Sequence, residues 1–242
     1  MKYGPAEMLT IALAREIQNE DIVFHGLASP VPMTAMKLAK ALGRNYTWIN
    51  ITGGVDPEWG KPAVSGSTLM RNQYDGTVAH FGLDEIFDLA GRGGVDISFI
   101  SLVQIDQSGH INMSYVGGDY FNPKMRLPGG AGTAMIVPVM KKTIIWKTKH
   151  DPKSFVREVD CATATANPEK IFRVITPLCI FNLIHGRLEV EGIFPSSSLE
   201  EVKANTGWEI KQETVPVFPE PTQQELDMLD KIDPNRIRYV EF

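Results

Sequence analysis

The stretch "DIVFHGLASPVPMTAMKLAKALGRNYTWINIT", residues 21–52, decides the fold class. Its first seven residues are a short apolar run that ends at a glycine step, which is typical of a buried strand. Residues 32–43 have apolar side chains at helical spacing and end at Gly43, a common residue at a helix C-terminus. Residues 46–52 alternate apolar and polar side chains and predict a second strand. This order of strand, helix and strand predicts a parallel sheet with helices on both faces.

The rest of the chain continues this alternation. Further helices are predicted at 5–19, 83–94 and 198–207, and further strands at 95–106, 134–140, 142–148 and 187–195. The Gly-rich stretches 60–79 and 117–132 are predicted as loops. The expected fold class is α/β, with an open, mostly parallel sheet layered by helices. The length of 242 residues with 43% hydrophobic content favours one domain over residues 1–242.

Composition limits the possible partners. The net charge is −5 and the basic residues are scattered, so nucleic acid is not an expected partner. No apolar run approaches the roughly 20 residues needed to span a bilayer, and no signal core opens the chain, so we expect a cytoplasmic protein without membrane contact. Cys161 and Cys179 lack metal-ligand spacing and predict buried thiols, with neither a disulfide nor a metal site.

The first candidate site is the end of the second predicted strand. Thr52 is followed by Gly53 and Gly54, and α/β proteins place chemistry where parallel strands end. Thr52 is either a functional residue or a strand-end residue that satisfies its own backbone. Asp56 and Glu58 follow in the loop, either as solvated charges or as an acid and base.

The second candidate site is "RLPGGAGTA", residues 126–134. Its glycines allow main-chain N–H groups to approach a ligand closely and suit an oxyanion or a phosphate, although a simple tight turn is an alternative. The pattern is neither a Walker loop nor a dinucleotide fingerprint. No Gly-x-Ser-x-Gly elbow is present, and the five histidines share no pattern with a Ser or Cys. His110 is predicted in a turn with a surface role.

Three segments together resemble a known family. They are "FGLDEIFDLAGRGGVDISFISLVQIDQSGHINMS" (81–114), "LPGGAGTA" (127–134) and "PTQQELDMLDKIDP" (221–234). The set is similar to the β subunit of family I CoA-transferases of the glutaconate CoA-transferase type. The resemblance implies an open α/β sheet, a separate α subunit of similar fold in a heterodimer or higher oligomer, coenzyme A as part of an acyl-CoA substrate, and no metal.

One position departs from the family pattern. The family has a glutamate at the start of the motif that reads Thr52-Gly53-Gly54 here, and that glutamate attacks the acyl-CoA. A carboxylate can exchange acyl groups through an anhydride, and a threonine hydroxyl cannot. Two related branches tolerate its loss: ring-cleaving CoA-ester hydrolases that rely on a carboxylate of the α subunit, and a decarboxylase with cysteine at this position. Neither Cys161 nor Cys179 falls there.

We therefore expect the β subunit of a heteromeric enzyme acting on a dicarboxylic or keto acyl-CoA, as a hydrolase, a C–C cleaving enzyme or a decarboxylase. The resemblance implies three groups of site residues, namely Thr52, Gly53 and Gly54 at the catalytic corner, Gly129, Gly130, Ala131 and Gly132 around the thioester oxygen, and Gln104, Asn112 and Arg126 as substrate contacts. A CoA-transferase proper with a carboxylate supplied elsewhere and a non-catalytic CoA-ester-binding subunit remain alternatives. An unrelated sugar-phosphate isomerase is disfavoured because no acid and base pair stands out.

Overall fold

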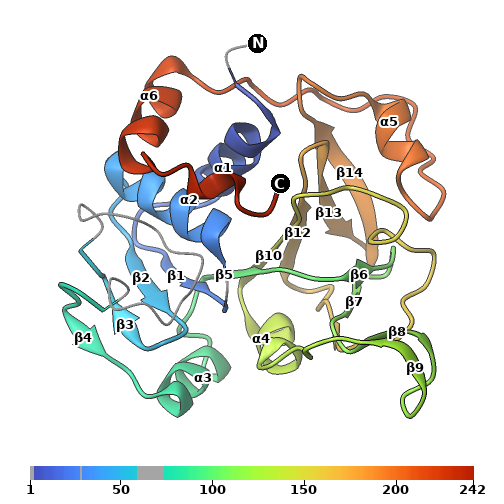
Figure 1. The fold of residues 1–242 in the computed structure, drawn as a ribbon, viewed down its shortest axis with the longest axis horizontal. Coiled ribbons are helices and arrows are strands. Elements are labelled where there is room, and N and C mark those ends of the chain that lie inside the picture. Colours follow the sequence, from blue (N-terminus) through green and yellow to red (C-terminus); the bar gives the residue numbers. More distant parts are fainter. Residues whose placement is uncertain (1–2, 28, 59–73) are drawn as a thin grey trace. The chain divides into compact units, whose positions relative to one another are not determined.

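A computed structural model describes residues 3–27, 29–58 and 74–242. The chain forms two compact units, one of Met1–Ile100 with Glu220–Phe242 and one of Ser101–Pro219, which we call unit 1 and unit 2. Both are mixed α/β structures, which confirms the expected fold class (Figure 1). The single domain expected from the length stays a prediction. The greater part of the predicted loop at 60–79 lies outside the described residues.

Unit 1 is built on three parallel strands. Its strand order is β5-β1-β2-β3-β4, in which β1 pairs in parallel with both β5 and β2, and the short β3 and β4 add antiparallel pairs. The elements are α1 (Pro5–Arg15), β1 (Ile22–His25), α2 (Pro30–Ala41), β2 (Thr47–Asn50), β3 (Gly54–Val55), β4 (Ala79–His80), α3 (Leu83–Gly91), β5 (Ile97–Ile100), α6 (Gln223–Ile232) and the 3₁₀ turn η2 (Ile237–Tyr239). The order strand, helix, strand predicted over 21–52 is confirmed.

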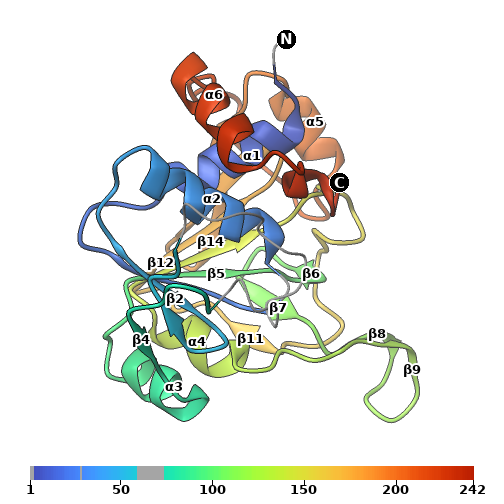
Figure 2. The same cartoon turned by 60° about the vertical axis from the view of Figure 1, so that its left-hand side comes forward.

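The helices of unit 1 lie on both sides of its strands. In both views α1, α2 and α6 lie on one side and α3 lies on the other (Figure 1, Figure 2). Helix α6 begins at a capping box, in which the Thr222 hydroxyl accepts from the Glu225 N–H and Glu225 accepts from the Thr222 N–H. Arg15 of α1 then binds Glu225 at 2.8 Å. The C-terminal helix is thereby fixed to the first helix, 210 residues away in sequence.

Unit 2 contains two sheets and a hairpin. Its larger sheet has the order β14-β13-β12-β10, with β10 and β12 parallel and the other pairs antiparallel; the second sheet is β11-β7-β6, and β8 pairs with β9. The elements are β6 (Gln104–Ile105), β7 (His110–Asn112), β8 (Tyr115–Gly118), β9 (Pro123–Arg126), α4 (Thr133–Val139), β10 (Lys142–Trp146), β11 (Ala164–Thr165), β12 (Ile171–Ile175), β13 (Cys179–Ile184), β14 (Arg187–Ile193) and α5 (Leu199–Ala204).

Three expectations for local structure are wrong. The predicted strand at 134–140 is helix α4, a helix of about two turns that follows Gly132 and buries Ile136 and Val137. A short apolar run fits either structure. The predicted loop at 117–132 contains the β8–β9 hairpin. The predicted strand at 95–106 is two strands, since β5 ends at Ile100 and β6 begins at Gln104.

The two cysteines differ in their surroundings. Cys179 is fully buried, and burial raises the pKa of its thiol, so this residue fits the expectation of a buried thiol. Cys161 is only half-buried, so the expectation is wrong for that residue. Within the described ranges, no group of three or more His, Cys, Asp or Glu side chains could hold a metal ion. Among the same residues, no helix has the length and apolar character of a membrane span.

Candidate functional site

Thr52 lies in a tight turn just after β2. The strand ends at Asn50, two residues earlier than predicted, and Gly54–Val55 turns back to pair antiparallel with it. Gly53 has a φ of +97°, and a Cβ atom there would lie 2.1 Å from the carbonyl oxygen of Phe81. Only glycine fits this position, because an L side chain would be both strained and in collision. Gly53 and Gly54 are buried, so they shape the turn instead of lining an open mouth.

The amide side chain of Asn50 organises this turn. Its Oδ1 accepts hydrogen bonds from the Thr52 N–H at 2.9 Å, from the Gly54 N–H at 3.3 Å and from the Thr52 hydroxyl. Its carbonyl oxygen accepts from the Gly53 N–H at 2.9 Å. We call residues Thr52, Gly53 and Gly54 the Thr52 corner. All three of their N–H groups donate to Asn50. Asn50 is not among the site residues expected from the sequence, although an Asn two residues before a Thr-Gly pair is the signal of an Asx turn.

The carboxylate of Asp56 is engaged inside unit 1. It binds the Lys40 ammonium group at 2.9 Å and accepts a hydrogen bond from the Trp48 N–H at 2.9 Å. Asp56 has a φ of +44°, a conformation that this fixed side chain helps to hold. These contacts indicate that the Asp56 carboxylate stabilises the fold of unit 1, and they do not favour a role as a catalytic acid or base.

The glycine-rich loop of unit 2 presents main-chain donors. Gly129 has a φ of +92°, and Ala131 has a φ of +43°, which is unusual for a residue with a side chain. In the part of the chain that the structure describes, the N–H groups of Gly130, Ala131 and Gly132 have no acceptor. Ala131 is exposed and the glycines beside it are half-buried. Free N–H groups in three consecutive residues are donors of the kind that bind a negatively charged oxygen.

Thr163 holds this loop against the second sheet. Its hydroxyl accepts from the Met113 N–H at 2.9 Å and lies 2.6 Å from the Ser114 hydroxyl. The Met113 carbonyl in turn accepts from the Gly129 N–H at 2.9 Å. A Cβ atom on Gly130 would lie 2.5 Å from the methyl carbon of Thr163, so the loop approaches Thr163 as closely as a glycine allows. No local sequence signal indicates this role for Thr163.

The two predicted amide contacts form one buried network. Asn112 donates to Gln104 Oε1 at 2.6 Å and to the Tyr115 carbonyl at 2.7 Å, and its Oδ1 accepts from the N–H groups of Ser114 and Tyr115. Gln104 also donates to Asp160 at 2.7 Å. All four hydrogen-bonding positions of Asn112 are used, and the residue is fully buried. Through these contacts Asn112 fixes the backbone of Ser114 and Tyr115, at the start of the segment that leads to the glycine loop.

Arg126 lies on the β8–β9 hairpin. Its guanidinium group stacks on the rings of Tyr120, at 4.9 Å, and Tyr115, at 5.7 Å. The hairpin extends away from the other strands of unit 2 (Figure 2), and Tyr120 and Phe121 at its tip are exposed. Arg126 is therefore an exposed cation on this hairpin, and its guanidinium group also donates to the Tyr120 carbonyl.

His110 is the first residue of β7, directly after the turn in which it is expected, and its Nδ1 lies 2.9 Å from Asp106 Oδ2. This turn borders a pocket of about 670 Å³ whose lining includes Arg157, Arg187 and Trp208. The lining carries charges of both signs and does not include the glycine loop. The structure thus assigns the predicted site residues to two local groups: the Thr52 corner in unit 1, and the glycine loop with Gln104, Asn112 and Arg126 in unit 2.

The fold is that of an α/β protein whose glycine loop presents free main-chain N–H groups, and comparison with known proteins identifies its family. Residues 6–205 match the family model described as coenzyme A transferase. This chain belongs to the coenzyme A transferase family.

Individual relatives agree with this assignment. The β subunit of the 3-oxoadipate CoA-transferase of Pseudomonas knackmussii is 31% identical over 252 residues, which cover 96% of this chain and 94% of that subunit. The solved decarboxylase AibA/AibB superposes with a TM-score of 0.91 at 28% identity, over 98% of both chains. Glutaconate coenzyme A-transferase of Acidaminococcus fermentans superposes with a TM-score of 0.84 over 97% of this chain and 96% of that one. At 22% identity, this last likeness shows the fold alone. The expected resemblance to β subunits of CoA-transferases is confirmed.

Proposed function

We propose that this chain is the β subunit of a heteromeric enzyme that acts on an acyl-CoA without forming a covalent acyl intermediate on this chain. The observation that carries the proposal is Thr52, which stands in the "TGG" motif where the family pattern has a glutamate. Its hydroxyl points at the amide oxygen of Asn50, which is not a base, so this contact does not activate it as a nucleophile. The reaction is then hydrolysis, C–C cleavage or decarboxylation, and the partner is a CoA-transferase α subunit.

The glycine loop supplies the electrophilic part of this chemistry. The N–H groups of Gly130, Ala131 and Gly132 would bind the thioester oxygen as negative charge develops on it. Arg126 would contact a second carboxylate of the acyl group. The solved decarboxylase AibA/AibB, similar over nearly the whole chain, supports a reaction other than transfer.

A covalent-trapping experiment tests this proposal. The complex with the α subunit is incubated with dicarboxylic and keto acyl-CoA esters, treated with borohydride, and analysed by mass spectrometry of each chain. We expect conversion of the acyl-CoA to free CoA or to a shortened acyl-CoA, and no adduct on this chain. A CoA adduct or a reduced residue at position 52 would contradict the proposal. The variant Thr52→Glu is the matched trial, because it restores the family carboxylate and should gain a trapped adduct.

One alternative also has direct support. The 31% identical relative is itself named as a CoA-transferase subunit, which favours transfer with a carboxylate supplied elsewhere. Adding a free carboxylic acid acceptor to the same assay separates the two. Formation of a new CoA ester would establish transfer, whereas free CoA or a shortened acyl-CoA would establish the proposed reactions.

A further inference from the structure

The hydrogen bonds around Asn50 fix where the proton of the Thr52 hydroxyl lies. The N–H groups of Thr52 and Gly54 can only donate, and both point at the same side-chain atom of Asn50, at 2.9 and 3.3 Å. That atom must be the amide oxygen, because the amide nitrogen has no acceptor capacity. An amide oxygen carries no proton, so in its contact with the Thr52 hydroxyl the hydroxyl is the donor.

This geometry leaves Thr52 with lone pairs and no free proton. Asn50 is fully buried, and its Cα pairs in register with His25 of the neighbouring parallel strand, so its side chain is held by the sheet. The half-buried Thr52 hydroxyl can therefore accept a hydrogen bond from an incoming group but cannot donate one to the thioester oxygen.

We propose that Asn50 is a positioning residue that makes Thr52 a hydrogen-bond acceptor for a donor group in the reaction, namely the attacking water or an N–H or O–H of the acyl-CoA. This inference rests on the proposed function, since it assumes that acyl-CoA reaches the Thr52 corner. Thr52 touches the reacting molecules, and Asn50 acts only through Thr52.

The first test reads the hydroxyl proton directly and does not depend on activity. In NMR spectra of the isotope-labelled chain, the Thr52 hydroxyl proton should give a resolved resonance protected from exchange with water. The variant Asn50→Ala should lose it, and Asn50→Asp should keep it. An unprotected hydroxyl in the wild type, or a protected one in Asn50→Ala, would overturn the donor assignment whether or not the enzyme acts on acyl-CoA.

The second test uses kinetics of the complex with the α subunit. Thr52→Val keeps the shape of the side chain and removes the acceptor, and should lower kcat/KM about 5- to 150-fold, since it leaves a donor unpaired. Thr52→Ser is the matched control and should stay within a few-fold of the wild type. Equal activity of the Val and Ser variants would refute the acceptor role, while complete inactivity of the wild type on every acyl-CoA would refute the proposed function instead.

A double-mutant cycle separates positioning from simple structural support. If Asn50 acts through Thr52, Asn50→Ala should add little to the loss already caused by Thr52→Val. If Asn50 only stabilises the turn, the two losses should multiply. Asn50→Asp should recover most of the activity near neutral pH and lose it in acid, as the introduced carboxyl is protonated, whereas the wild-type amide gives no such pH dependence. A thermal melt of each variant checks that it is folded, and Thr52→Val keeps the proposal testable if Asn50→Ala does not fold.

Discussion

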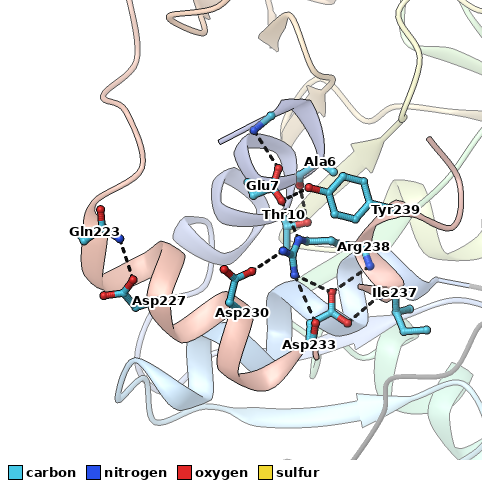
Figure 3. A network of polar contacts seen from close by, with 11 residues as sticks. Ala6, Glu7, Thr10, Gln223, Asp227, Asp230, Asp233, Ile237, Arg238 and Tyr239 are labelled. Atoms are coloured by element: carbon cyan, nitrogen blue, oxygen red, sulfur yellow. Dashed lines mark hydrogen bonds and ion pairs between the residues drawn. The ribbon is translucent and has the colours of Figure 1, made fainter. Parts of the chain in front are cut away.

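Replacing Arg238 with alanine should lower the free energy of unfolding of unit 1 by about 3 kcal/mol. Arg238 is 2% exposed, although it is a charged residue four positions from the C-terminal Phe242. Its guanidinium group binds Glu7 at 2.9 Å, Asp233 at 3.2 Å and Asp230 at 2.5 Å (Figure 3). One cation thus joins the first helix, the last helix and the C-terminal turn of the chain.

The magnitude follows from what the substitution leaves behind. The carboxylates of Glu7 and Asp233 are buried and would lose their common cation, and breaking a buried pair in this way typically costs about 3–5 kcal/mol. Other donors reduce the cost: Gly4 N–H and the Tyr239 hydroxyl still bind Glu7, and Ile237 N–H still binds Asp233. We therefore expect the lower end of the range.

Urea unfolding followed by far-UV circular dichroism measures this loss. Asp230→Asn is the matched control, because the Asp230 side chain is 71% exposed and its contact with the same guanidinium group should contribute less than about 1 kcal/mol. A loss below about 1 kcal/mol for Arg238→Ala, or an equal loss for both variants, would refute the reasoning that burial controls the cost.

The same network predicts a pH dependence. Burial alone would raise the pKa of Glu7, but hydrogen bonds from Tyr239 and Arg238 outweigh it and hold this pKa below the usual range. A lowered carboxyl pKa stabilises the fold above the pKa of the unfolded state, and this contribution is lost as the pH falls through the folded-state pKa. The difference in stability between wild type and Arg238→Ala should therefore narrow as the pH falls below about 4.5. A constant difference would contradict the assignment.

Three further predictions concern unit 2. Gly130→Val should lower kcat of the complex about 10²- to 10³-fold by forcing the N–H donors away from Thr163. Gly186→Ala, at a glycine with open space around it but a φ of +74° that strains a side chain, should lower stability and leave kcat unchanged. Asn112→Leu should lower the free energy of unfolding, measured in urea, by about 1–3 kcal/mol, because it leaves Gln104 Oε1 and the Tyr115 carbonyl without the hydrogen bonds that Asn112 donates. Burial lowers the pKa of His150 to about 3, so the unfolded chain alone takes up this proton below about pH 6.5. The free energy of unfolding should therefore decrease as the pH is lowered from about 6.5 towards 3. His150→Gln should reduce the slope of this free energy against pH by up to about 1.4 kcal/mol per pH unit, measured by urea unfolding at a series of pH values.

Much of unit 1 could be predicted because its local signals agree with its tertiary structure. The helical spacing of 32–41 and the alternation at 47–50 each indicate one type of element, and the apolar run at 22–25 fits a buried strand beside them. The observed elements cover these residues. Helix α4 could not be predicted, because "AMIVPV" suits a buried strand equally well and only its contacts decide. The same holds for Asn50, whose importance depends on three donors converging on one atom.

The functional residues divide in the same way. Clustered glycines indicate backbone conformations that other residues rarely adopt, so the loop at 129–132 could be predicted from the sequence. The positive φ of Gly129 agrees with this prediction. Gln104 and Asn112 follow from the family resemblance, but their burial and saturated hydrogen bonds indicate a supporting role. Thr163 has no local signal, because its partners Met113 and Ser114 are about 50 residues away.

The arrangement of donors and acceptors restricts the chemistry that this chain can contribute. Gly130, Ala131 and Gly132 offer hydrogen-bond donors, and Thr52, held by Asn50, offers an acceptor. The carboxylate nearest to Thr52 in sequence, Asp56, is bound to Lys40 and to the Trp48 N–H. On the proposed function, the chain therefore polarises the thioester and orients a donor, while the nucleophile or base must be water or a group of the α subunit. An enzyme of this kind should lose activity completely when the α subunit is removed, and the wild-type chain should carry no covalent intermediate at any stage of the reaction.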